Sequence, residues 1–143
     1  MSLLDAPAYD AARENRRRKR KIWAISIVIA VILIGVPLYF YLPYWRARQS
    51  VNHFMTALKN GNYQMAYYLW HANPKRYPMD AFMRDWGPKG EWGVVHSYKI
   101  IVVTAPPGPP ASGLVALVRI NQKPHEAKIW VENHNEDLSF YQF

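Results

Sequence analysis

The sequence contains no cysteine, which excludes disulfide bonds and cysteine-ligated metals. It also lacks a glycine-rich phosphate-binding loop and any recognisable serine or cysteine nucleophile motif. The five histidines show no metal-ligand spacing with a carboxylate, so we predict neither a metal site nor another cofactor. No acceptor sequence for N-glycosylation occurs, which fits a bacterial protein.

Charge is absent from one long stretch. The 21 residues from Ile22 to Leu42 include no charged side chain. As a helix they span roughly 30 Å, the thickness of the hydrocarbon core of a bilayer. They are apolar all round, unlike a surface helix of a soluble domain, and bulky residues rather than a cleavage site follow them. We therefore predict a retained transmembrane helix over residues 22–45, not a cleaved signal peptide. The anchor residues of note are Ile22, Trp23, Gly35, Pro37, Leu42, Tyr44 and Trp45.

Basic residues crowd the N-terminal side of this stretch. The predicted topology determinants are Arg16, Arg17, Arg18, Lys19, Arg20 and Lys21. Only Arg46 and Arg48 follow the stretch closely, so the positive-inside rule predicts a cytoplasmic N-terminus. Residues 1–21 are then a partly disordered cytoplasmic tail, and the rest lies outside, in the periplasm if the membrane is a bacterial inner membrane. A specific lipid or partner contact stays open for this tail; nucleic acid is disfavoured because no aromatic residues interleave with the basic ones.

Residues 46–143 form the predicted extracytoplasmic domain, which is rich in aromatic residues and therefore folded. Its first half has helical period. The first predicted helix carries an apolar face, begins at Ser50 or continues from the membrane span, and is followed by Gly61 as a cap. Two short helices follow, one over residues 62–70 and one over 80–86. The apolar face of the first helix consists of Val51, Phe54, Met55 and Leu58.

The second half has strand period. We predict strands over residues 90–105, 112–122, 125–133 and 138–143, separated by a proline-rich loop and two short turns. Because the connections are short, neighbouring strands should be antiparallel. Helices followed by a meander give an α+β domain with segregated halves.

The stretch FMTALKNGNYQMAYYLW resembles the opening helix pair of small nuclear-transport-factor-two-like domains, with their F-x-x-A-L-x-x-G-x-Y and A-Y-x-L patterns. The stretch AFMRDWG-x-x-G-x-W resembles their third helix and its entry into the first strand, through Phe82, Trp86, Gly90 and Trp92. The resemblance covers residues 48–143. It implies three helices on a curved four-stranded antiparallel sheet, wrapped as a cone, and a membrane-tethered bacterial member of unknown function.

The superfamily implied by this resemblance includes isomerases and dehydratases that use an Asp or His inside the cone. His96 alternates with Val94 and Tyr98, so we expect it to point inward. None of the candidates matches a catalytic pattern, so we predict that the protein is not an enzyme. The other candidates are His125, His134, Asp80 and Asp85.

Aromatic residues exceed what a core of this size needs, and two interpretations stay open: core packing, or a pocket or docking patch. The candidates are Tyr63, Tyr67, Trp70, Trp86, Trp92, Tyr98, Trp130 and Tyr141. We predict a single-pass accessory or scaffold protein whose outer domain binds a partner subunit of a membrane complex. The alternative is a small apolar-ligand-binding or catalytic cone. The expected partners are the lipid bilayer and other membrane-protein subunits, with an apolar small molecule as the alternative ligand.

Overall fold

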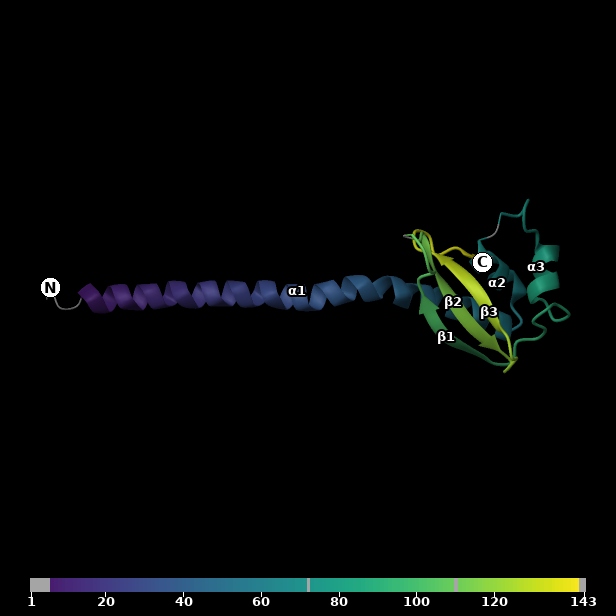
Figure 1. The fold of residues 1–143 in the computed structure, drawn as a ribbon, viewed down its shortest axis with the longest axis horizontal. Helices are drawn as coiled ribbons and strands as arrows, with labels where there is room; N and C mark the ends of the chain where they lie inside the picture. Colours follow the sequence, from purple (N-terminus) through teal and green to yellow (C-terminus); the bar gives the residue numbers. More distant parts are fainter. Residues whose placement is uncertain (1–5, 72, 110, 142–143) are drawn as a thin grey trace. The chain divides into compact units, whose positions relative to one another are not determined.

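The computed structural model describes residues 6–71, 73–109 and 111–141 (Figure 1). The helices are α1 (Ala6–Lys59), α2 (Tyr63–Trp70) and α3 (Met79–Trp86). The strands are β1 (Tyr98–Thr104), β2 (Gly113–Ile120), β3 (Glu126–Glu132) and β4 (Leu138–Phe140). The chain forms two units, Met1–Tyr41 and Leu42–Phe143. The predicted α+β class is confirmed.

The first unit contains the part of α1 before Leu42, and α1 is long and apolar enough to cross a membrane. The large apolar side chains between Ile22 and Trp45 are all at least 39% exposed. Gly35 has no atom within 4 Å of the position a Cβ would take, and Pro37 lies within the helix. The basic stretch before Ile22 is helical as well, where the sequence favoured partial disorder. The part of that expectation that concerns residues 1–5 lies outside the described residues.

In the second unit, α1 supplies the central core helix. The helix does not restart at Ser50 but runs on past Pro43 to Lys59, as the alternative interpretation of the sequence had it. The predicted apolar face is fully buried, with exposures of 1% or less for Val51, Phe54, Met55 and Leu58. Gly61 follows with φ +70°, a left-handed conformation that suits glycine and redirects the chain into α2.

The two short helices add aromatic side chains to this core. The Asn62 side chain accepts a hydrogen bond from the Met65 backbone N–H and so caps α2. Ala66 and Trp70 are buried on α2, and Phe82 and Trp86 are buried on α3. Both helices occur where the sequence predicted them, because their apolar residues recur with helical period.

The strands form one open antiparallel sheet in the order β1-β2-β3-β4 (Figure 1). Along β3, Ala127, Ile129 and Val131 are buried in the core that the helices share. Trp130 alternates with them, so it lies on the opposite, outer face of the sheet. Asn121 and Gln122 have positive φ values of 51° and 57°, and the Lys123 N–H donates to the carbonyl of Ile120, so the loop between β2 and β3 begins with a tight turn.

The expected first strand was placed too early. It begins at Tyr98 rather than at residue 90, because the backbone before it makes other hydrogen bonds. Asn121 Oδ1 accepts from the N–H groups of His96 and Ser97, and Asn121 Nδ2 donates to the carbonyl of Val94 at 2.6 Å. These three backbone groups bond to a side chain and so do not take part in strand pairing. His96 is consequently exposed, and the expectation that it points inward was wrong.

Candidate functional site

Three of the predicted site aromatics are fully packed inside the helix-and-sheet core. Trp70, Trp86 and Trp92 are 3%, 0% and 6% exposed. The Trp86 ring centroid lies 5.0 Å from that of Phe54 in an edge-to-face contact and 5.8 Å from that of Phe140 in a parallel stack. These rings fill the space between the helices and the inner face of the sheet, and their contacts are the ones that favour aromatic packing.

Three tyrosines from the same set are half-buried at the border of this core. Tyr67 Oη donates a hydrogen bond of 2.8 Å to the carbonyl of Tyr77. Tyr63, one turn earlier on α2, also packs on the core. Tyr98 Oη donates to Asn52 Oδ1 at 2.6 Å, and it lies 2.9 Å from the hydroxyl of Thr56. Tyr98 therefore joins the start of β1 to the side of α1.

The last two members of the set lie away from the core. Trp130 and Tyr141 stack with an interplanar angle of 7° and ring centroids 6.0 Å apart. The indole of Trp130 covers Gly113, where an added Cβ would come within 2.6 Å of the ring. Trp130 Nε1 donates to Glu132 at 3.1 Å. This pair is a half-buried aromatic surface on the outer face of the sheet.

Tyr77 is half-buried in the loop before α3, and its hydroxyl donates a hydrogen bond to a carboxylate of that helix. Burial raises the pKa of Tyr77 above its ordinary value, and the carboxylate of Asp85, which accepts a 2.6 Å hydrogen bond from its hydroxyl, raises it further. Both effects favour the neutral phenol. The hydrogen bond between Tyr77 and Asp85 therefore holds the loop before α3 against that helix, and the Tyr77 hydroxyl stays protonated.

The predicted ionisable candidates do not converge. His125 and His134 are exposed, and the His125 ring lies 5.2 Å from Trp92. Asp80 is exposed in the first turn of α3, where a carboxylate suits the helix dipole. Within the described residues no group of three or more His, Asp or Glu side chains could hold a metal ion.

Sequence reasoning missed one contact between a histidine and a carboxylate. Nδ1 of His71 contacts Oδ1 of Asp137, although the two residues are 66 positions apart. His71 has φ +48° at the end of α2, and Asp137 lies in the turn before β4. No local pattern in the sequence links the two positions.

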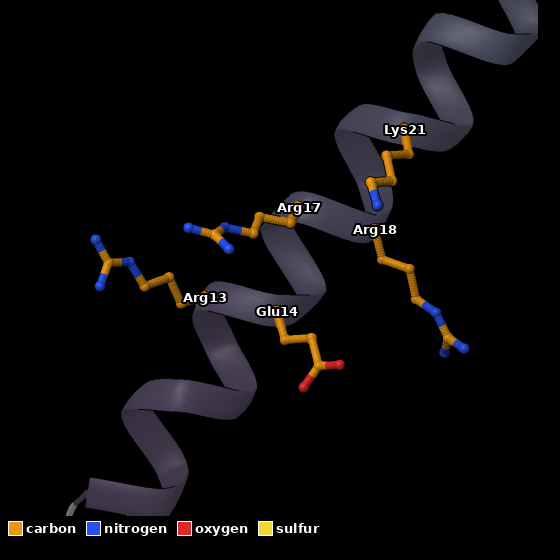
Figure 2. A pocket seen from close by; sticks show the side chains of 5 residues that line it. All are labelled: Arg13, Glu14, Arg17, Arg18 and Lys21. Atoms are coloured by element: carbon orange, nitrogen blue, oxygen red, sulfur yellow. The ribbon is translucent and has the colours of Figure 1, made fainter.

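The basic side chains of residues 13–21 project from all sides of α1 and do not form one stripe along it. Figure 2 shows Arg13 and Arg17 reaching out on one side of the helix and Glu14 and Arg18 on the other. Together with Lys21 they border an open hollow of about 550 Å³. Because seven basic residues lie within nine positions at 100° steps, positive charge faces nearly every direction. Such a collar suits the headgroup layer of a membrane more than a one-sided partner.

A second open hollow lies in the folded unit, between α1 and the start of β1. We call it the basic groove. It has a volume of about 570 Å³, and its charged lining residues are all basic: Arg48, Lys59 and Lys99. The remaining lining residues are Gln49, Asn52, Ser97, Tyr98 and Ile100. Arg48 and Lys59 belong to one helix, but Lys99 comes from a strand, so the sequence alone gave no sign of the groove.

Comparison with protein-family models, with curated proteins and with solved structures finds no match to this chain. The residues that carry the resemblance described above serve the fold: Phe54, Phe82 and Trp86 lie in the core at 0% exposure. What the groove and the outer aromatic pair can bind is therefore argued from their own geometry and charge.

Proposed function

We propose that this chain is a single-pass membrane protein of the nuclear-transport-factor-two-like group and that its folded unit binds a partner subunit of a membrane complex. The support for the anchor is the band of exposed apolar side chains between Ile22 and Trp45. A soluble protein rarely exposes so large a contiguous apolar surface, whereas a bilayer covers it. Three helices followed by an antiparallel meander are the element order that the resemblance implies.

The proposed orientation has the N-terminus in the cytoplasm and the folded unit outside. The basic collar Arg13–Lys21 precedes the apolar band, and the chain after the band offers only Arg46 and Arg48 at short range. Topology follows such asymmetry in Lys and Arg. In bacteria this places the folded unit in the periplasm, with the anchor in the inner membrane.

The observation that carries the binding proposal is the filling of the inner face of the sheet by aromatic rings. Phe54, Phe82 and Trp86 are each 0% exposed and lie in edge-to-face or stacked contacts with their neighbours. A ligand cavity would need this same space. Recognition therefore takes place on the outside of the unit, where the basic groove and the outer aromatic pair lie.

Two measurements test the proposal. A C-terminal alkaline phosphatase fusion in bacteria should be active, and a C-terminal green fluorescent protein fusion should be dark; the reverse pair would overturn the orientation. The full chain in mild detergent should co-purify as part of a larger complex in gel filtration and native mass spectrometry. A monomer that carries a bound lipid-like or aromatic molecule, with no partner protein at any salt concentration, would instead support the ligand-binding cone.

A further inference from the structure

The basic groove carries unneutralised positive charge. Arg48, Lys59 and Lys99 all line it, and none of them forms an ion pair with another described residue. Among the described lining residues there is no Asp or Glu. Three like charges around one hollow repel each other, and an acidic ligand would remove that repulsion.

The groove opens beside an unpaired strand edge. Its helical wall is a single stripe, because Arg48, Asn52 and Lys59 lie on one side of α1 next to the buried face. Its other wall is β1, which pairs with β2 on one edge and has no strand on the other within the described sheet. A free edge presents backbone N–H and C=O groups that another extended chain can pair with.

The same strand exposes apolar side chains next to the charges. Ile101 and Val102 are 38% and 40% exposed, and the register shifts between Ile100 and Val102, which marks a bulge. The strand itself carries Lys99 and no acidic residue. A second copy of β1 added along this edge would bring a like charge into the groove, so the charge pattern disfavours self-pairing and favours an acidic strand.

The length of the groove distinguishes two candidate ligands, an extended peptide and a lipid headgroup. Arg48 and Lys59 are eleven residues apart on α1, which corresponds to about 16 Å along a helix. An extended chain covers that distance with about five residues. A single headgroup phosphate is much shorter than that distance, so an extended acidic segment fits the length of the groove better.

We propose that the basic groove binds an extended, acidic segment of a partner protein, which adds to the sheet along the free edge of β1. Acidic side chains on the face of that segment that turns toward α1 meet Arg48 and Lys59, and Lys99 adds a third positive charge from β1. Its backbone pairs with β1, and its apolar residues contact Ile101 and Val102. This inference rests on the proposed function, since it names the chemistry of the partner that the folded unit takes.

The test uses the full chain in nanodiscs of phosphatidylcholine and a fluorescent octapeptide of alternating Glu and Val. The peptide should bind, and a matched Lys–Val peptide should not. The triple variant Arg48→Gln, Lys59→Gln, Lys99→Gln should weaken binding about tenfold or more, as expected when charge pairs are lost from an interface. Hydrogen exchange should show new protection of the β1 amides when the peptide is bound.

The matched control removes the same net charge elsewhere, at the exposed residues Lys75, Lys89 and Lys128, each changed to Gln. It should keep wild-type affinity, and any background binding to the basic collar is common to both variants. Equal weakening in both triple variants, or binding without protection of β1, would overturn the proposal. So would a groove that binds glycerophosphoglycerol, a headgroup probe, and not the Glu–Val peptide.

The peptide measurement does not depend on finding the native partner. A negative result therefore overturns the groove assignment alone. The absence of any complex in the co-purification would overturn the proposed function instead, so the two failures are distinguishable.

Discussion

Nδ1 of His71 contacts the carboxylate of Asp137, and this joins the end of α2 to the turn between β3 and β4. The same turn is held from a second side, because Ser50 Oγ donates a 2.7 Å hydrogen bond to Glu136. Asn135 also donates to Asp137. One short turn thus ties two helices to the edge of the sheet.

We expect Asp137→Ala to lower the free energy of unfolding by about 1 kcal/mol, which is the upper range for exposed ion pairs. The side chains of His71 and Asp137 are 42% and 37% exposed, so solvent screens the attraction between them. Thermal melting of the full chain in detergent measures the change. Glu91→Ala is the control, since the exposed Glu91 side chain forms no hydrogen bond or ion pair with another described residue, and it should melt like the wild type. A variant at Asp137 that also melts unchanged would show that the contact contributes nothing.

Trp86→Ala should destabilise the folded unit by roughly 3–5 kcal/mol, because it empties a large volume in a fully buried site. Trp86→Phe is the matched variant. The Trp86 indole N–H has no hydrogen-bond partner among the described residues, so Phe removes ring volume without breaking a hydrogen bond. It should cost clearly less than Ala in chemical denaturation. Equal costs for the two variants would argue against the packed environment described here.

Gly113→Ala should destabilise the protein by about 1–3 kcal/mol through overpacking. An added Cβ would contact the carbonyl of Val131 and approach the Trp130 ring to 2.6 Å, so the outer aromatic pair must shift. Trp fluorescence should report the displaced ring, and thermal melting should report the cost. Gly35→Ala serves as the comparison, because nothing lies within 4 Å of the new atom there. If both glycine variants behave alike, Trp130 does not cover Gly113.

The stability of the folded unit should fall as the pH rises above the ordinary tyrosine pKa of about 10. The raised pKa of Tyr77, caused by burial and by Asp85, keeps the folded form protonated while the unfolded chain ionises. The contribution of Tyr77 is therefore complete below that pH and is lost above it. In Tyr77→Phe the alkaline decline should be shallower, although the variant starts from a lower stability because Asp85 loses its hydrogen bond. Identical alkaline slopes for variant and wild type would contradict this account.

Much of the fold could be predicted from periodicity. The buried face Val51–Leu58, the left-handed Gly61 and the two short helices follow from local spacing and cap residues, which the nearby sequence determines. The later strands also appear where alternation predicted them, with β4 ending at Phe140 within the described residues.

The errors and omissions share one physical cause, which is contact between distant positions. The residues before Tyr98 have strand-like composition, but the side chain of Asn121 binds their backbone. The basic groove joins Arg48 to Lys99, and the His71–Asp137 contact spans 66 positions. Propensity and spacing describe residues that are neighbours along the chain, so they do not predict contacts between distant positions.

Asn121 has a consequence for the order of folding. It occupies the hairpin turn between β2 and β3, and its amide fixes the backbone from Val94 to Ser97. The β2–β3 hairpin closes a short loop, whereas the contacts of the Asn121 side chain with Ser97 and Val94 close loops of 24 and 27 positions. The hairpin therefore loses less chain entropy on closure and should form earlier. In pulsed hydrogen exchange during refolding, the amides of β2 and β3 should gain protection before those of His96 and Ser97. Asn121→Asp, which keeps the acceptor but loses the donor to Val94, should delay the late phase and leave the early one unchanged.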